Sequence, residues 1–309
     1  MYVEILGSAA GGGFPQWNCN CGNCRSVRER NFLGKARTQT QVAVSDDGHA
    51  WFLLNASPDL RIQIEQSAAL EPNGSTRSSP INAVVLTSAD IDHIAGLLSL
   101  RELQRFRIYS TPSLGRILRE DNSIFGMLNR APQQVCWMDM AVEAEFALPR
   151  ISGEDSGLRC EAISVGDKYP VYVSQRCASS LRGLEAQVGL VITGSSEKRL
   201  AYLPAVPAIS AKLLELLQDV DVVLFDGTFW SDDELRQVLG SGATAREIGH
   251  VPVSGPQGSL ELLKQLKRPR KVFLHINNTN PMLNESGPEY RELTASGWQL
   301  AEDGWRLNL

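Results

Sequence analysis

The feature that most constrains the fold is a continuous apolar run that ends abruptly in polar residues. Residues 81–88 read INAVVLTS, and residues 89–103 follow directly with helical periodicity as ADIDHIAGLLSLREL. A run without polar alternation is typical of a strand buried on both faces, which requires a sheet covered by helices. Because strands and helices are interspersed along the rest of the chain, the sequence predicts an α/β protein with two packed sheets flanked by helices.

Other strands and helices are predicted from alternation, β-branched content and turn signals. No low-complexity tract or linker divides the chain, so residues 1–309 are expected to form a single domain. Helices are predicted at residues 56–66, 210–217, 231–240 and 255–267. Strands are predicted at residues 2–6, 41–45, 50–55, 105–111, 158–165, 169–173, 188–193, 199–203, 221–227 and 271–277, with a final pair around 297–307.

Composition argues against several classes of protein. The chain has 309 residues, 43% of them hydrophobic, and a formal net charge of −5. A protein that binds nucleic acid through phosphate contacts needs a basic face, so no nucleic-acid partner is expected. No run approaches the roughly 20 apolar residues that span a bilayer, and the first residues lack the charged and apolar regions of a signal peptide. We therefore expect a cytoplasmic protein without membrane insertion.

Three of the six cysteines fall within six residues, as Cys19, Cys21 and Cys24 in the run NCNCGNC. Crowded thiolates either bind a soft cation or form a local disulfide, and disulfides are rare in the cytosol. The spacing C-x-C-x-x-C lets three sulfur atoms surround one tetrahedral zinc ion, with a fourth ligand from elsewhere. The sequence therefore predicts a structural Zn2+ site that holds the N-terminal loop.

Four polar residues follow the buried strand: Ser88, Asp90, Asp92 and His93. Ligands of α/β proteins bind at the carboxyl ends of strands, and the adjacent Asp92 and His93 can present a carboxylate and an imidazole to one ion. The alternative is that Asp90 caps the helix and His93 packs in its first turn. Spacing alone leaves both interpretations open.

The segment LTSADIDHIAGL, residues 86–97, resembles the signature T-H-x-H-x-D-H-x-x-G of the metallo-β-lactamase superfamily. The two leading histidines of that signature are replaced by Ser88 and Asp90. The glycine loop at residues 7–13 with its cysteines resembles a branch that contains a phosphonate-pathway cyclic phosphodiesterase with a structural zinc. Together with FDGTFWSDDE, GHVPVSGPQGS and FLHINNTNP, the chain resembles the family of coenzyme PQQ synthesis protein B. This resemblance implies the four-layer αβ/βα metallo-β-lactamase sandwich.

The resemblance also implies which metal ligands survive. The superfamily's first metal site has lost nearly all its ligands, and Asp90 alone is a candidate there. The second site keeps Asp92, His93 and His275, which are two histidines and one carboxylate. Such a set favours a mononuclear site for Fe2+ and O2 chemistry, with a single zinc acting as a Lewis acid as the alternative. A binuclear hydrolase would need two ions about 3.5–4 Å apart.

Three further residues are candidates by resemblance. Asp226 and His250 correspond to an acidic residue and a histidine that lie beside the metal in related nucleases, and such a pair can orient an imidazole that carries protons. The alternative is that Asp226 caps a helix and His250 is an ordinary loop histidine. Asn278 corresponds to the histidine that completes the structural zinc site of the phosphodiesterase, so it is the candidate fourth ligand.

The resemblance implies a role in the synthesis of pyrroloquinoline quinone (PQQ). The first hypothesis is a non-haem Fe2+ hydroxylase that uses O2 as co-substrate to hydroxylate the tyrosine ring of a precursor derived from Glu-Tyr. The second is a carrier that assists transport of PQQ or its precursor to the periplasm. A degenerate metallo-hydrolase is the third. A homodimer is compatible with the sequence, which does not determine the oligomeric state.

Overall fold

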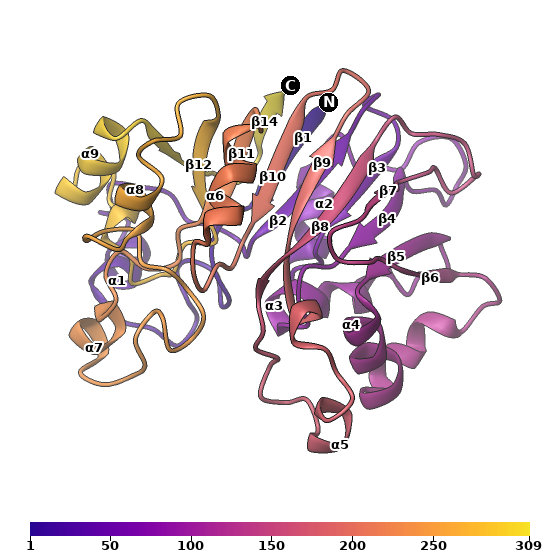
Figure 1. Ribbon diagram of the computed structural model, residues 1–309, viewed down its shortest axis with the longest axis horizontal. Helices are drawn as coiled ribbons and strands as arrows, with labels where there is room; N and C mark the ends of the chain where they lie inside the picture. Colours follow the sequence, from indigo (N-terminus) through magenta and orange to yellow (C-terminus); the bar gives the residue numbers. More distant parts are fainter. The chain divides into compact units, whose positions relative to one another are not determined.

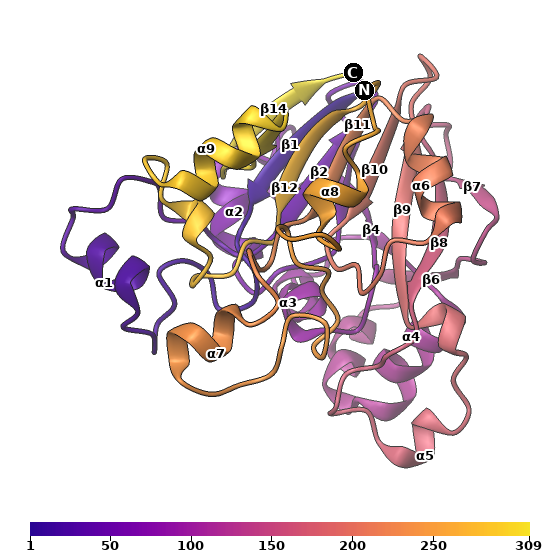
Figure 2. The same cartoon turned by 60° about the vertical axis from the view of Figure 1, so that its left-hand side comes forward.

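The computed structural model describes residues 1–309, which divide into two compact units. The first unit comprises Met1–Leu6, Gln41–Lys198 and Gly304–Leu309, and the second comprises Gly7–Thr40 and Arg199–Asp303. Each unit combines strands with helices (Figures 1 and 2), so the predicted α/β class is confirmed. The organisation as one domain stays a prediction.

The first unit contains a seven-stranded mixed sheet. The apolar run at residues 81–88 forms a central strand at Ile81–Val85, which is buried at every residue, as predicted. The strands predicted at residues 41–45 and 50–55 are present and pair antiparallel as a hairpin. In sheet order the strands are β14 (Trp305–Asn308), β1 (Tyr2–Gly7), β2 (Gln41–Ser45), β3 (Trp51–Leu54), β4 (Ile81–Val85), β5 (Phe106–Ser110) and β6 (Val135–Asp139).

Three antiparallel strands and several short helices complete this unit. The helices cover a hydrophobic core that includes Trp51, Leu97 and Phe106. The strands are β7 (Glu145–Ala147), β8 (Arg159–Gly166) and β9 (Gln187–Thr193). The α-helices are α2 (Leu60–Gln66), α3 (Ile91–Ile94), α4 (Pro112–Arg116) and α5 (Gln175–Ala178). Short 3₁₀ helices lie at Ala95–Leu100, Ser123–Asn129 and Gly183–Glu185, and a π-helical turn lies at Ile117–Asp121.

The strand predicted at residues 169–173 is wrong, because this segment forms an irregular loop. Pro170 has no N–H to donate to a neighbouring strand, which disfavours pairing. The tyrosines that suggested a strand anchor the loop instead. The hydroxyl of Tyr169 donates to a backbone carbonyl at 2.7 Å, and that of Tyr172 donates to the carbonyl of Ala89, just before α3.

Gly96, just after α3, lies in a position with no room for a side chain. Its N–H donates to the carbonyl of Ala56 at 2.9 Å, and an added Cβ would lie 2.1 Å from the carbonyl oxygen of Ser57. We expect Gly96→Ala to lower the free energy of unfolding by about 3 kcal/mol, the upper end of the usual cost of overpacking. Gly126→Ala is the control, because an added Cβ there meets nothing within 4 Å. Equal denaturant midpoints for the two variants would contradict this expectation.

The second unit contains four parallel strands. In order they are β13 (Trp298–Leu300), β12 (Arg270–Leu274), β11 (Val222–Asp226) and β10 (Arg199–Leu203). Its helices are α1 (Gly22–Arg28), α6 (Ala211–Gln218), α7 (Glu234–Leu239), α8 (Ser259–Leu262) and α9 (Pro288–Ala295), with a single turn at Pro281–Leu283.

The register of these strands brings two predicted site residues to one edge. Asp226 of β11 pairs with Leu274 of β12, so His275 follows directly beside it. The carboxyl ends of parallel strands are where α/β proteins place functional groups. The strand edge, rather than any loop, therefore positions these two side chains.

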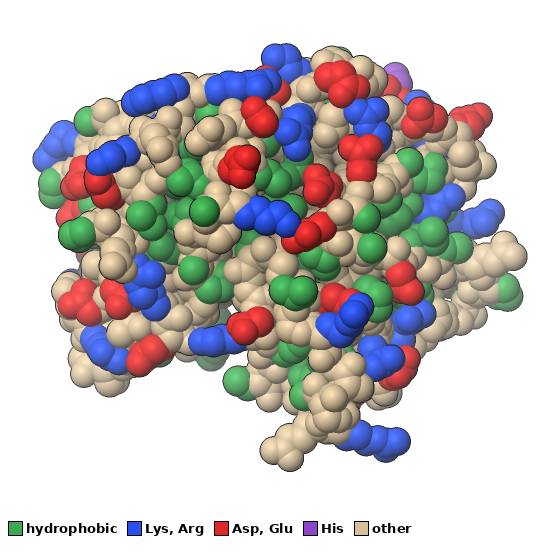
Figure 3. Space-filling view, viewed as in Figure 1, with side chains coloured by type: hydrophobic (Ala, Val, Ile, Leu, Met, Phe, Trp, Pro, Cys, Tyr) green, Lys and Arg blue, Asp and Glu red, His purple; other side chains and the backbone are tan.

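Two features of the structure concern apolar helices and surface charge. No helix is both long and apolar enough to cross a bilayer. On the face drawn in Figure 3, Lys and Arg side chains are interspersed with Asp and Glu side chains. That face therefore presents no continuous basic field of the kind that binds phosphate backbones.

Candidate metal sites

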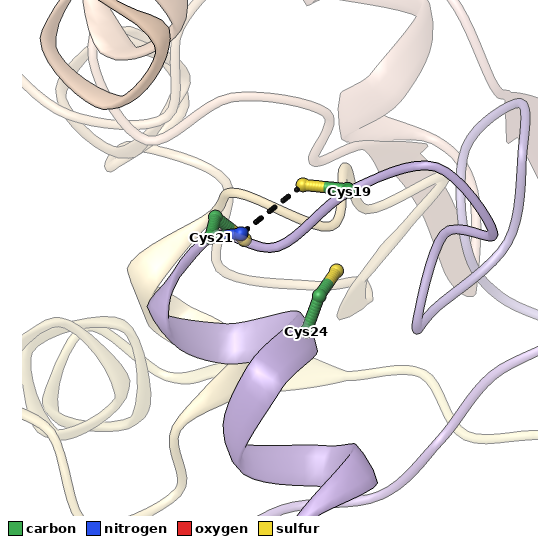
Figure 4. Close-up of side chains that lie close together, drawn as sticks. All are labelled: Cys19, Cys21 and Cys24. Atoms are coloured by element: carbon green, nitrogen blue, oxygen red, sulfur yellow. Dashed lines mark hydrogen bonds between the residues drawn. The ribbon is translucent and has the colours of Figure 1, made fainter.

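The three clustered cysteines lie at the start of α1 in the second unit. Cys19 and Cys21 precede the helix, and Cys24 lies in its first turn with its side chain fully buried. The three Sγ atoms lie within 4.8 Å of one another, as the loop and helix in Figure 4 bring them together. Sulfur atoms around a tetrahedral zinc lie about 3.8 Å apart, since each Zn–S bond is about 2.3 Å long. Small side-chain rotations would therefore close the triplet around one ion.

Asn278 faces all three sulfur atoms. Its Nδ2 atom lies 3.1 Å from Cys19 Sγ, 3.3 Å from Cys24 Sγ and 3.7 Å from Cys21 Sγ. The oxygen and nitrogen of an amide exchange places by a half-turn, so Oδ1 can occupy the same position and act as a ligand. The chain therefore brings the predicted fourth ligand to the open side of the cysteine triplet.

The surroundings of the triplet affect its thiols differently. Burial raises the pKa of Cys24 to about 11. At Cys19, burial also opposes ionisation, but hydrogen bonds from Cys21, Cys24 and Asn278 outweigh it and lower the pKa. The lowered pKa of Cys19 makes its thiol easier to ionise, which suits a metal site because the thiolate is the metal ligand.

In the first unit, the loop after β4 holds His93 through a hydroxyl group. Ser88 Oγ lies 2.8 Å from His93 Nδ1 and donates to Asp90 Oδ2 at 2.7 Å. Asn55, at φ +67°, accepts a hydrogen bond from the Thr87 N–H at 2.8 Å and fixes the end of the strand. His93 is buried and Asp92 is partly exposed in α3. Asp90 precedes the helix but makes no side-chain cap, so its carboxylate orients Ser88 rather than the helix end.

In the second unit, Asp226, His250 and His275 meet around one threonine. Thr228 Oγ1 lies 2.6 Å from Asp226 Oδ1, 2.8 Å from His275 Nδ1 and 3.1 Å from His250 Nδ1. His250 Nδ1 also lies 2.8 Å from Asp226 Oδ2. The two imidazole rings stack with centroids 5.5 Å apart. The predicted Asp226–His250 pair is therefore in direct contact.

Asp226 is fully buried, and both of its oxygens accept hydrogen bonds. Besides His250 and Thr228, the backbone N–H of Val206 donates to Oδ2 at 2.9 Å. Burial alone would raise the pKa of Asp226, but the charge and hydrogen bond of His250, with His275 and Thr228, lower it. Asp226 is therefore a buried anion whose hydrogen bonds orient His250. This role suits it better than that of a base that accepts protons from a substrate.

His275 adopts an uncommon backbone conformation. Its φ is +59°, in the left-handed region that non-glycine residues rarely enter. Strained backbone conformations persist where surrounding structure imposes them, and they cluster at functional sites. The Gly227 N–H donates to the carbonyl of Leu274 at 2.8 Å, and the Ile276 N–H donates to that of Ser8 at 3.0 Å. These bonds hold the backbone on both sides of His275.

Sequence analysis missed three residues that build these sites. Thr228, Asn55 and Glu234 are buried polar residues. Thr228 and Glu234 lie within the segment FDGTFWSDDE, but neither was named as a site residue. Thr228 lies two positions after Asp226, and that proximity was the available signal. The sequence did not show how Asn55 and Glu234 are connected, because their partners Thr87 and Thr279 are far away in the sequence.

Glu234 connects α7 to the loop that carries Asn278. The backbone N–H of Trp230 donates to its Oε2 at 2.6 Å, and the Thr279 hydroxyl donates to its Oε1. Burial nevertheless raises the pKa of Glu234 to about 7. The folded chain therefore binds a proton here between the unfolded pKa of about 4.3 and about 7, so stability falls as pH rises through that range.

The Glu234→Gln variant tests this pKa. Glutamine keeps the shape but cannot ionise, so the variant lacks that pH-dependent loss. As pH rises from 4.5 to 7.5, the parent chain should lose about 3 kcal/mol of unfolding free energy at this residue. The variant should not show this loss. Denaturant unfolding across this range measures it, with the exposed Glu215→Gln as control. A pH-independent difference for Glu234→Gln would contradict the raised pKa.

Comparison with known proteins identifies the family. A model described as a beta-lactamase superfamily domain matches residues 50–276. The proteins named coenzyme PQQ synthesis protein B from Xanthomonas axonopodis pv. citri and Pseudomonas protegens are 41% and 39% identical to this chain, and each alignment covers 100% of both sequences. The chain belongs to the coenzyme PQQ synthesis protein B family. The suspected resemblance is confirmed.

Solved structures support the same assignment. The structure described as Zn(2+)-bound PqqB from Methylobacterium extorquens matches with a TM-score of 0.91 at 40% identity, covering 100% of both chains. A diphosphatase of the PhnP family matches with a TM-score of 0.68 at 20% identity, covering 100% of this chain and 97% of that one, which supports the fold alone. The predicted metallo-β-lactamase fold is therefore confirmed.

Proposed function

We propose that this chain is an iron-dependent hydroxylase in the synthesis of coenzyme PQQ. The family named for that synthesis covers the whole chain, which supports the pathway and a small-molecule precursor as substrate. The reaction is hydroxylation of the tyrosine ring of a precursor derived from Glu-Tyr. Asp92, His93 and His275 hold the metal.

The donor set carries this proposal. Two histidines and one carboxylate, with open positions left for other ligands, form the set used by non-haem Fe2+ oxygenases. The chain has only four histidines, and Ser88 and Asp90 replace the two that lead the superfamily signature. The absence of these two histidines disfavours the second ion that a binuclear hydrolase uses to clamp its nucleophile.

The hydrogen bonds within each unit fit this role. His93 and His275 each have Nδ1 beside a hydroxyl group, which directs Nε2 of each ring away from that contact. His250 is held by Asp226 and stacks on His275, so it would be available to accept or return a proton next to this proposed ligand. Bound iron supplies the one-electron and O2 chemistry that no side chain offers.

The proposed reaction balances with an external reductant. One oxygen atom of O2 becomes the ring hydroxyl and the other becomes water. Two electrons from an added reductant and two protons complete the reduction. His250 is the residue that we propose moves a proton.

We further propose that Cys19, Cys21, Cys24 and Asn278 hold a structural Zn2+. Three sulfurs and one amide group meet at one point, and zinc commonly takes four ligands in structural sites. A crystal structure of a family member is described as zinc-bound, which supports zinc as a metal of this fold.

The experiment that tests the function compares metals and substrates. The metal-free chain is loaded anaerobically with Fe2+, Zn2+ or Mn2+ and offered a Glu-Tyr dipeptide with O2 and a reductant, or an activated phosphodiester. Ring hydroxylation with Fe2+ alone is the expected result. Tight binding of PQQ without turnover would instead support the carrier hypothesis, and phosphodiester cleavage with Zn2+ or Mn2+ would support a hydrolase.

A further inference from the structure

The two histidines proposed as metal ligands share a local arrangement. In the first unit, Ser88 Oγ lies 2.8 Å from His93 Nδ1 and 2.7 Å from Asp90 Oδ2. In the second unit, Thr228 Oγ1 lies 2.8 Å from His275 Nδ1 and 2.6 Å from Asp226 Oδ1. Each imidazole therefore contacts a hydroxyl group, and each hydroxyl group contacts a carboxylate. The two chains of contacts come from different segments and do not depend on each other.

The single hydrogen of each hydroxyl group determines which nitrogen of the neighbouring imidazole carries a proton. A hydroxyl group has one hydrogen to donate, and an ionised carboxylate has none. The hydrogen of Thr228 must therefore point to Asp226, because two oxygen atoms 2.6 Å apart without a proton between them would repel. The Thr228 oxygen then accepts, so His275 Nδ1 must carry a proton. The same reasoning assigns a proton to His93 Nδ1, because Ser88 donates to Asp90.

We propose that Ser88 and Thr228 are positioning residues that hold His93 and His275 in the tautomer with a proton on Nδ1. In that tautomer the lone pair of each ring lies on Nε2, the atom that a metal ion would bind. Ligating histidines commonly donate the other ring N–H to a group that fixes ring orientation. This inference rests on the proposed role of the two histidines as ligands.

The residues that replace the two leading histidines of the signature take part in this arrangement. Ser88 and Asp90 stand where the superfamily signature carries its two leading histidines. Those two positions are not simply lost ligands. They form the hydroxyl and carboxylate that orient His93, and Thr228 with Asp226 does the same for His275 without any counterpart in the signature.

Histidine ring nitrogens can be observed directly by NMR, and the chain has only four histidines to assign. The test compares Thr228→Val, which keeps the shape and removes the hydroxyl, with Thr228→Ser, which keeps the hydroxyl. At a pH where the rings are neutral, we expect nitrogen-15 shifts of the parent chain and of Thr228→Ser to report a proton on Nδ1 of His275. In Thr228→Val the proton should move partly or wholly to Nε2. Ser88→Ala should do the same to His93 and leave His275 unchanged.

Metal affinity provides a second measurement without any turnover. The cysteine site is first filled with Zn2+. We then expect Thr228→Val to weaken Zn2+ binding at the proposed histidine and aspartate site about 10- to 100-fold, and Thr228→Ser to bind as the parent chain does. An unchanged His275 tautomer in folded Thr228→Val, or equal loss in Thr228→Ser, would overturn the inference. If the tautomer shifts as expected but the iron-loaded parent chain hydroxylates nothing, the inference stands and the hydroxylase proposal fails.

Discussion

Replacing His275 by alanine should abolish ring hydroxylation and remove the metal that Asp92, His93 and His275 are proposed to bind. His275 is buried and directly follows β12, and backbone hydrogen bonds hold Leu274 and Ile276 on either side of it. Loss of a bound metal removes several kcal/mol of catalytic stabilisation, so we expect the rate to fall by roughly 1,000-fold or more. Metal content and turnover are measured on the same iron-loaded sample.

His49→Ala is the matched control for this variant. His49 is exposed in the β2–β3 turn and is not among the proposed metal ligands. The control should keep both metal and activity. A His275→Ala chain that still binds one iron and turns over at the parental rate would refute the proposed ligand set.

Replacing Cys21 by serine should lower stability through loss of the structural zinc. A serine oxygen is a poor substitute for a thiolate, and the free energy of zinc binding is part of the free energy of folding. We expect a loss of roughly 3–5 kcal/mol, which for a chain of this length corresponds to a fall in Tm of about 5–8 °C. Thermal unfolding combined with zinc analysis measures both consequences.

Cys136→Ser is the control for the cysteine variant. Cys136 lies on β6, in the first unit, and takes no part in the cysteine cluster. It should retain zinc and show only a small change in Tm. If Cys21→Ser kept its zinc and unfolded at the parental temperature, the cysteine triplet would not be a structural metal site.

The fold was predictable because its signals are local. The apolar run of β4 and the polar loop after it lie within twenty residues of sequence, and the cysteine triplet lies within six. The same locality explains the error at residues 169–173. Aromatic residues there suggested a strand, but Pro170 prevents pairing, and the tyrosine hydroxyls bind backbone groups that are distant in sequence.

The candidate residues were predictable by type, but their connections were not. Asp226 and His250 were paired by resemblance, and their contact at 2.8 Å agrees. Thr228 has only its proximity to Asp226 as a signal, because a threonine after a strand is common in any α/β protein. Its position between three site residues depends on the register of β11 and β12. Sequence reasoning names side chains that can do chemistry, whereas tertiary structure decides which hydroxyl groups orient them.

The most direct test of the central proposal is to follow the oxygen atom. The iron-loaded chain is given a Glu-Tyr dipeptide, a reductant and O2 labelled with oxygen-18, and the product is analysed by mass spectrometry. We expect each hydroxylation to add one labelled oxygen to the tyrosine ring, and we expect no product from His275→Ala. An unlabelled hydroxyl, or no mass gain from a chain that holds iron, would contradict the assignment as an oxygen-dependent hydroxylase.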